Sequence, residues 1–203
     1  MTLTIEATGV DEFTEYLETF PDIAPRALAL ALNDTARDAL AGPIKDAIMA
    51  QTAFPAGYLD DPSRIGVNIF ARPDSLEAGI VGRHRATSLA RFVTGGAGQG
   101  GQFQSGLVVT VNPSSPISLD EAFLVPLRSG NTGLAIRLGA GQQPRDTTGA
   151  VSLGKGLWLL YGASVDQVFS DVAGELSEPI ADMLTAEFFR QFDVQLTRQN
   201  NGG

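Results

Sequence analysis

The closing part of the chain carries an apolar repeat that is long enough to define one helix of many turns. Apolar side chains recur there at spacings of three and four residues from Val165 to Phe188, which places them on one face of an α-helix. We therefore expect a C-terminal helix over 165–193. Pro179 lies inside the repeat and predicts a kink or a division of this helix. Such a helix is stable only when its apolar face is covered, so the remaining residues must supply a body that packs against it.

Residues 1–51 are expected to form an extended arm followed by helices. From Pro25 to Ala41, apolar residues at helical spacing are interleaved with alanine, the best helix former, and predict a helix. Gly42 and Pro43 interrupt this helix, because glycine is flexible and proline lacks the backbone N–H that a helix interior needs. The pattern then resumes as a second helical stretch that ends at about Gln51.

The residues between these helices, 64–161, predict strands joined by long loops. Runs rich in branched and aromatic side chains are bounded by turn-forming residues. They lie at 64–70, 77–81, 107–111 and 155–161, with two more strands between Ile117 and Leu138. A loop is expected over 94–106, where six of thirteen residues are glycine, and a second polar loop over 139–149.

The order of helix, strands and helix predicts a single α+β domain over 1–203. We expect a central antiparallel or mixed β-sheet, flanked by a long N-terminal helix and a long C-terminal helix, with extended glycine-rich loops. Both helices should pack on one side of this sheet, because each has an apolar stripe to cover. Their shared core is expected to contain Leu28, Leu32, Leu40, Phe169, Val172 and Leu176.

Composition removes much of the usual enzymatic repertoire. The chain has no cysteine and one histidine, which excludes disulfides, thiolate metal sites, cysteine nucleophiles and a metal site built from several histidines of one chain. We expect no cofactor. No run of about 18 apolar residues occurs, and the first residues lack the basic and apolar regions of a signal peptide. We therefore expect neither a membrane anchor nor a secretion signal.

One segment comes close to a phosphate-binding loop. Gly149 to Gly156 satisfies the pattern G-x-x-x-x-G-K, but Gly156 stands where a serine or threonine would hold magnesium. The following residues predict a strand, whereas a phosphate loop leads into a helix. The segment therefore does not predict nucleotide binding.

Neither the adjacent carboxylates nor the histidine defines a catalytic site. Neighbouring residues on an extended chain point in opposite directions, so Asp60 and Asp61 are not expected to share a site. His84 lies between two arginines and has no catalytic partner at a fixed spacing, so we interpret it as a surface or hydrogen-bonded residue rather than a general base.

The charge of the chain is unevenly distributed. Residues 1–63 hold 3 Lys and Arg against 11 Asp and Glu, residues 64–155 hold 9 against 5, and residues 156–203 hold 2 against 7. The middle is therefore basic by 4, the ends are acidic by 8 and by 5, and the whole chain carries −9. This segregation suits subunits that meet through unlike patches. The alternative is that the polar faces of the helices are simply acidic.

The middle and closing segments together resemble a known family. The residues that carry the resemblance are Glu121 to Leu124 entering a strand, Asn131 to Gly133 as a turn, Leu134 to Arg137 as the return strand, Gly162 to Val165 opening the last helix, and the alanine-rich helix from Ala24 to Leu40. They resemble the minor tail protein Z family of tailed bacteriophages, also called tail completion proteins. The chain differs from some relatives in being acidic where they are strongly basic.

The resemblance implies a virion structural protein rather than an enzyme. Such a subunit would form a homo-oligomeric ring in the neck or tail, contact other phage neck and tail proteins, and let DNA pass through the lumen without specific binding. It would be found in the virion, and in the host cytoplasm during assembly. On this hypothesis the subunit contacts are made by basic and aromatic residues of the middle, namely Arg83, Arg85, Arg91, Phe103, Arg128, Arg137 and Trp158.

A hydrolase remains the alternative. It would act through surface carboxylates, and the glycine-rich loop over 94–106 would serve as its lid. A hydrolase should present a concave site with perturbed carboxylates, whereas a tail component should form a closed ring or wait as a monomer for its partner.

Overall fold

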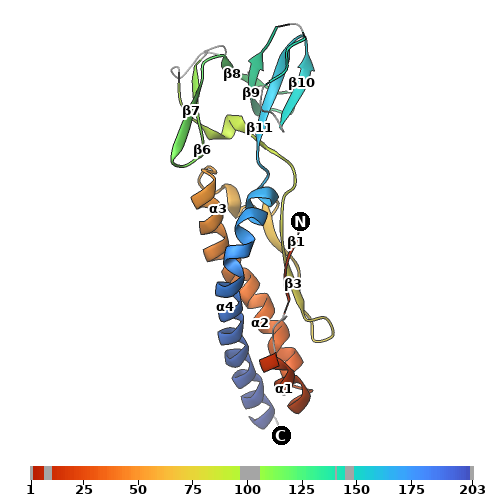
Figure 1. The fold of residues 1–203 in the computed structure, drawn as a ribbon. Helices are drawn as coiled ribbons and strands as arrows, with labels where there is room; N and C mark the ends of the chain where they lie inside the picture. The colour runs from red at the N-terminus through yellow and green to blue at the C-terminus, as the bar shows by residue number, and fades with distance from the viewer. Residues whose placement is uncertain (1, 7–10, 97–105, 140, 145–148, 202–203) are drawn as a thin grey trace.

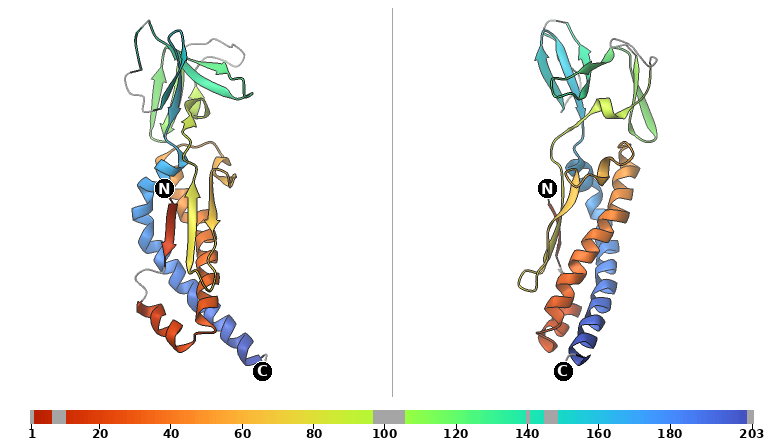
Figure 2. Two further views of the ribbon diagram at one scale, coloured as in Figure 1. Left: turned by 90° about the vertical axis from the view of Figure 1, so that its right-hand side faces the viewer. Right: turned by 180° about the vertical axis from the view of Figure 1, so that it is seen from behind.

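The protein is an elongated α+β molecule, with a helical stalk and a β-rich head at one end of it (Figure 1). The computed structural model describes residues 2–6, 11–96, 106–139, 141–144 and 149–201. The α+β class agrees with the sequence prediction. The head is inserted between two parts of the stalk, so that the first and last thirds of the chain lie side by side (Figure 2).

The stalk combines helices with one small sheet. Its helices are α1 (Asp11–Thr19), α2 (Ala24–Ala39), the π-helical turn η1 (Leu40–Ile44), α3 (Lys45–Gln51) and α4 (Val165–Asn201), and a 3-10 turn, η2 (Tyr58–Asp60), follows α3. Its sheet has the order β1-β3-β2 and consists of β1 (Thr2–Glu6), β3 (Glu77–Gly82) and β2 (Ile65–Ile69), all antiparallel. Both α2 and α4 contact β3, so the two long helices cover the same side of this sheet.

The head contains two further antiparallel sheets. The larger follows the order β10-β11-β9-β8 and consists of β10 (Ala150–Gly154), β11 (Leu157–Gly162), β9 (Thr132–Arg137) and β8 (Ala122–Pro126), with β4 (Thr87–Ser88) paired to the end of β11. The smaller has the order β5-β6-β7 and consists of β5 (Val93–Gly95), β6 (Leu107–Asn112) and β7 (Ser115–Leu119). A 3-10 turn, η3 (Leu89–Phe92), joins β4 to β5.

The strands are thus divided among three sheets instead of gathered in one central sheet. Tight connections make β6 pair with β7, β8 with β9 and β10 with β11. Because these neighbours satisfy one another's backbone groups, they close into the head and do not extend the sheet of the stalk. Of the expected glycine-rich loop, residues 97–105 lie outside the described residues.

The core of the stalk is the contact between α2 and α4. On α2 this face is made largely of alanine, with Ala24, Ala27, Ala31, Ala36 and Ala39 fully buried. Small side chains allow the helices to approach closely and leave room for bulky partners on α4. The predicted shared core is confirmed: Leu28, Leu32, Phe169, Val172 and Leu176 are buried, and Leu40 packs partly buried against them.

The two predicted breaks in the helices have different outcomes. Gly42 and Pro43 interrupt the α-helix as predicted, since α2 ends at Ala39 and α3 begins at Lys45, but the π-helical turn η1 keeps the chain helical between them. The wider turn accommodates a proline that cannot donate a hydrogen bond. Pro179 does not divide α4, which runs as one helix from Val165 to Asn201. The helix also continues beyond the expected end near residue 193, to Asn201.

Far from the head, a polar network joins α2 and α4. Gln191 Nε2 donates to Asp34 Oδ2 and to Glu187 Oε1, each at 2.9 Å. Arg190 Nε donates to Glu187 Oε2 at 2.8 Å. These hydrogen bonds from Arg190, followed by those of Gln191, lower the pKa of Glu187 against the opposing effect of burial. The network fixes the register of the two helices at this end of the stalk.

The alanine-rich contact predicts that two leucines of α2 contribute very differently to the free energy of unfolding. Leu32 is fully buried, so Leu32→Ala should lower the free energy of unfolding by about 2 to 5 kcal/mol. Leu30 lies on the same helix and is 40% exposed, so Leu30→Ala should change it by less than about 0.5 kcal/mol. Urea unfolding followed by circular dichroism measures both. Equal losses in the two variants would contradict the assignment of the buried face.

Glu187 should make stability depend on pH. A carboxyl whose pKa is lower in the folded chain contributes stability above its unfolded pKa, and this contribution is lost as the pH falls through the folded value. Stability should therefore drop below about pH 4.5, the ordinary pKa of this group, and Glu187→Gln should reduce that drop. Glu178→Gln, at an exposed position of the same helix, is the matched control. Thermal melts between pH 3 and pH 6 (about the range in which carboxyls titrate) test the difference.

Candidate anion-binding site between stalk and head

The chain passes between stalk and head through two short segments, and the first of them is basic. Residues 83–86 lead from β3 to β4, and residues 163–164 lead back from β11 to α4. Arg83 N donates to Arg64 O at 2.8 Å, and Asp166 N donates to Arg83 O at 3.3 Å. Gly82 is required here, because a Cβ at this position would lie 2.8 Å from Asp166 Cα. The basic segment is therefore held firmly between β2 and the start of α4.

The start of α4 is itself fixed by a capping box. Gln167 N donates to Ser164 Oγ at 3.1 Å, and Ser164 N donates to Gln167 Oε1 at 2.9 Å. This reciprocal pair satisfies backbone donors that a helix start leaves unpaired. In the same turn, Asp166 Oδ2 lies 2.9 Å from His84 Nδ1. The lone histidine is thus a bonded residue that links the two crossing segments, as interpreted from the sequence.

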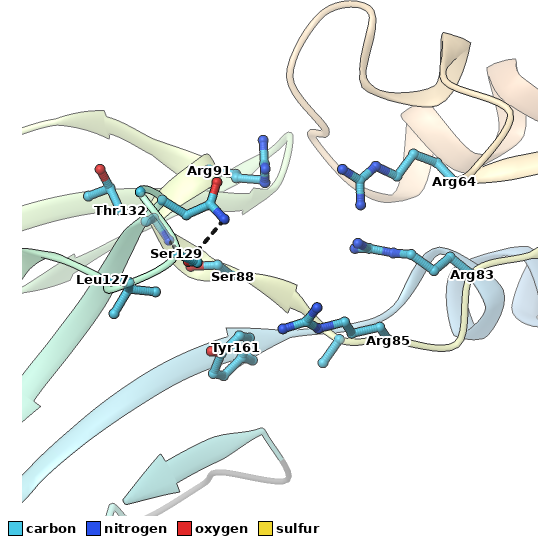
Figure 3. Close-up of a pocket in the computed structure, with 13 residues that line it drawn as sticks. Arg64, Arg83, Arg85, Ser88, Arg91, Leu127, Ser129, Thr132 and Tyr161 are labelled. Atoms are coloured by element: carbon cyan, nitrogen blue, oxygen red, sulfur yellow. Dashed lines mark hydrogen bonds between the residues drawn. The ribbon is translucent and has the colours of Figure 1, made fainter. Parts of the chain in front are cut away.

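A hollow of about 500 Å³ opens between stalk and head beside the basic segment (Figure 3). Four arginines from three places in the chain line it: Arg64 precedes β2, Arg83 and Arg85 lie in the crossing segment, and Arg91 lies on η3. Arg64, Arg83 and Arg85 point from one side toward the space that Arg91 and Ser129 border on the other (Figure 3). We call this site the arginine hollow. The rest of its lining is Ala86, Ser88, Ala90, Leu127, Ser129, Gly130, Asn131, Thr132 and Tyr161.

Tyr58 holds three of the four arginines in place. Its ring has Arg64 Cζ 4.9 Å and Arg91 Cζ 5.3 Å from the centroid, distances at which a guanidinium is attracted to an aromatic ring. Arg83 Nη2 donates to the Tyr58 hydroxyl at 2.7 Å. The ring is buried and stacks on Phe54 with 5.1 Å between centroids. A rigid aromatic pair therefore brings positive groups together that would otherwise repel one another.

The positive charge of the arginine hollow is poorly compensated within the chain. Arg64 pairs with Asp61, whose Oδ2 lies 3.4 Å from Arg64 Nε. Within the described parts of the chain, no carboxylate lies at ion-pair distance from Arg83, Arg85 or Arg91. Burial, and then the nearby Arg64, Arg85 and Arg91, lower the pKa of Arg83 against the opposing effect of Tyr58. Arg83 Nε is also buried without a hydrogen-bond partner.

This arrangement suits the binding of an anionic group. Guanidinium groups bind carboxylates and phosphates through paired, charge-assisted hydrogen bonds. A bound anion would also offset the mutual repulsion of the arginines. The carboxylate beside the hollow, Asp61, accepts hydrogen bonds from Ser63, which lower its pKa. It is therefore kept ionised and is not suited to donate a proton.

Comparisons with protein-family models, with curated proteins and with solved structures give no match. The site is therefore interpreted from its own geometry. Among the described residues, no group of three or more His, Asp and Glu side chains could hold a metal ion. None of the described helices is long and apolar enough to cross a membrane.

The arginine hollow contains part of the interface predicted from the sequence. Arg83, Arg85 and Arg91 come together in it, whereas Arg128, Arg137 and Trp158 are not among its lining residues. Arg128 is exposed in the turn whose neighbours line the hollow, Arg137 is exposed at the end of β9, and Trp158 is partly buried on β11 opposite Ile136. Phe103 lies outside the described residues.

Sequence reasoning missed Arg64 and Tyr58. The strands over 64–70 and 77–81 were predicted, and their antiparallel register pairs Ile65 with Gly82. That register places Arg64 beside Arg83, so pairing these two strands would have found it. No comparable signal marks Tyr58, which reaches the arginines only because the loop after α3 folds back as η2.

The segment that resembles a phosphate-binding loop is a β-hairpin. Residues 150–154 form β10 and residues 157–162 form β11. The turn between them contains Gly154, Lys155 and Gly156, all with positive φ. Because no helix follows, helix amides cannot face a phosphate there. The prediction that this segment is not a nucleotide site agrees with the fold.

Two other predictions made from local sequence can be compared with the structure. Asp60 pairs with Lys45 at 2.8 Å while Asp61 pairs with Arg64, so these two carboxylates do not share a site, as expected. The predicted turn at Asn131 to Gly133 is wrong, because β9 already begins at Thr132. The turn lies earlier, where Gly130 N donates to Leu127 O and Gly130 adopts φ +79.

The arginine hollow should bind tripolyphosphate specifically, beyond the general effect of ionic strength. Tripolyphosphate should therefore raise the melting temperature more than sodium chloride does at equal ionic strength. Arg85→Gln removes one exposed, charged hydrogen-bond donor. The variant should therefore bind tripolyphosphate about tenfold more weakly than the wild type. Arg137→Gln, an exposed arginine outside the hollow, should leave the Kd unchanged. Isothermal titration calorimetry measures these values, and equal weakening in both variants would indicate nonspecific attraction.

Proposed function

We propose that this chain is a structural subunit of a tailed-phage virion, a neck or tail completion protein that works by assembling into a ring rather than by catalysis. The arginine hollow is the observation that carries the proposal. It concentrates unpaired positive charge in a chain of net charge −9. An acidic surface of a neighbouring subunit is the nearest complement in such an assembly.

Ring formation requires two different surfaces on each subunit. Neighbours in a ring are related by a heterologous contact, so one patch must fit another elsewhere on the same chain. The arginine hollow supplies a basic patch, and the helices of the stalk are acidic. The elongated stalk also suits subunits that stand side by side around a lumen (Figure 2). An acidic lumen would let DNA pass without specific binding.

The proposed interface also includes residues outside the arginine hollow. Arg128, Arg137 and Trp158 in the head, together with Phe103 in the glycine-rich loop, would meet the neighbouring subunit or other neck and tail proteins. The subunit would reside in the virion, after assembly in the host cytoplasm.

A hydrolase acting through surface carboxylates is less well supported. The concave surface with shifted pKa values is lined by arginine, and its neighbouring carboxylate Asp61 has a lowered pKa. A general acid would need a raised one.

Self-association tests the proposal. The wild-type chain should form closed rings at high concentration, visible by negative-stain electron microscopy. Arg83→Glu with Arg85→Glu should slow assembly, and the slowing should grow as salt is lowered because reversed charges repel more strongly without screening. Sedimentation velocity measures the effect, and circular dichroism checks that the variant is folded. Antibody labelling of phage particles then locates the subunit, and absence of labelling would contradict the virion assignment.

A further inference from the structure

Helix α4 carries a stripe of carboxylates on the side opposite its buried face. Asp171, Glu175, Glu178 and Asp182 are all exposed and follow one another at spacings of four, three and four residues. Residues at these spacings share one narrow face of a helix. The buried residues Val172, Leu176, Ile180 and Leu184 lie on the other side, against the core. We call these four carboxylates the acidic stripe.

The acidic stripe is not balanced within its own helix. From Val165 to Phe189, α4 contains no lysine or arginine, and its first basic residue, Arg190, is bonded to Glu187. In the described parts of the subunit, none of the four carboxylates of the stripe lies at ion-pair distance from a cation. Like charges at these spacings destabilise a helix. A contact with external cations would reverse this penalty.

The acidic stripe and the arginine hollow carry opposite charges. Four carboxylates face outward on the helix, and four guanidinium groups line the hollow. Eleven residues separate Asp171 from Asp182, which corresponds to about 16 Å along the helix at 1.5 Å per residue. An arginine set that spans two strand ends and a 3-10 turn can receive carboxylates from successive turns of one helix.

The acidic stripe begins near the junction of stalk and head and runs away from it along α4. The hollow opens at this junction, and α4 begins there with Val165 (Figure 1). Asp171 therefore lies about 9 Å and Asp182 about 26 Å from the first residue of α4 along the helix axis. Neighbours in a closed ring are related by rotation without translation, so an elongated subunit must be inclined to the ring axis for its stripe to reach the hollow of the next copy. The exposed carboxylates of α1, such as Glu15 and Glu18, lie at the far end of the stalk and would require an offset stacking (Figure 1).

We infer that the acidic stripe of one copy docks into the arginine hollow of the next copy of this chain. The inference rests on the proposed self-assembly and names the surfaces that carry it. Phosphates of a nucleic acid are the competing occupant of the hollow. The uncompensated positive charge of Arg83, Arg85 and Arg91 and the uncompensated negative charge of the stripe favour the second copy.

A charge-exchange experiment tests the docking on the full chain. The stripe variant carries Glu175→Lys and Glu178→Lys, and the hollow variant carries Arg85→Glu and Arg91→Glu, all at exposed positions. Each should weaken association by at least about tenfold, because like charges then face each other. In an equimolar mixture of the two variants, every contact between unlike variants again pairs opposite charges, so only alternating rings with an even number of subunits can close. One chain that carries all four changes does not depend on the number of subunits and is the decisive sample. That chain restores opposite charges at every contact and should associate to within about threefold of the wild type.

The control variant carries Glu15→Lys and Glu18→Lys on α1, which changes the net charge by the same amount as the stripe variant. It should associate like the wild type. Sedimentation velocity reports association, and thermal melts verify that every variant folds. Wild-type rings together with normal association of the stripe variant would overturn the docking while leaving the proposed function intact. A wild-type chain that never self-associates would overturn the proposed ring itself.

Binding of a short DNA duplex to the same variants shows whether a nucleic acid or a second copy of the chain occupies the hollow. If the hollow variant alone loses DNA binding and the stripe variant forms rings normally, the hollow is a phosphate site and the docking is overturned. If DNA binding is weak in the wild type and association follows the charge exchange, the second copy is the occupant.

Discussion

The close approach of α2 to α4 is the contact on which the rest of the molecule depends. Alanines on α2 bring two helices from opposite ends of the sequence together, and the same pair supports the three-stranded sheet through β3. Because interiors are packed as densely as crystals, this contact fixes where α4 begins and therefore where the crossing segments lie. The position of the arginine hollow follows from that placement. The packing of small apolar residues between the two helices thus determines where the charged groups lie at the junction of stalk and head.

The junction brings together positively charged groups that repel one another. Four guanidinium groups repel, and Tyr58 offsets part of that repulsion through its ring and its hydroxyl. The acidic stripe on α4 is the same situation with the opposite sign, because its carboxylates lie in a row on one helix and repel one another. Each surface is less favourable alone than it would be against an opposite charge. Both surfaces are therefore stabilised by contact with groups of opposite charge.

The sequence predicted local elements well and their assembly only in part. The helices and the strands β2, β3, β6 and β11 follow from apolar spacing and from turn residues, because these signals are local. The division into three sheets depends on which strands pair, and short strands carry little information about their partners. The π-helical turn at Gly42 and Pro43 was missed because flanking packing overrides the usual effect of proline. Of the site, Arg83, Arg85 and Arg91 were found as a dense basic run, whereas Arg64 and Tyr58 depend on tertiary contact.

The two crossing segments make the head an insertion whose two ends lie close together. Thr87 and Gly162 pair across β4 and β11, so the chain enters and leaves the head at adjacent points, which in an antiparallel pair lie about 5 Å apart. The stalk between β3 and α4 therefore needs only a short turn to close without the head. Evolution can exchange such an insertion for another of different size or surface while the helical scaffold keeps its packing. Arg83 and Arg85, which lie in the crossing segment itself, would stay at the junction whichever head followed.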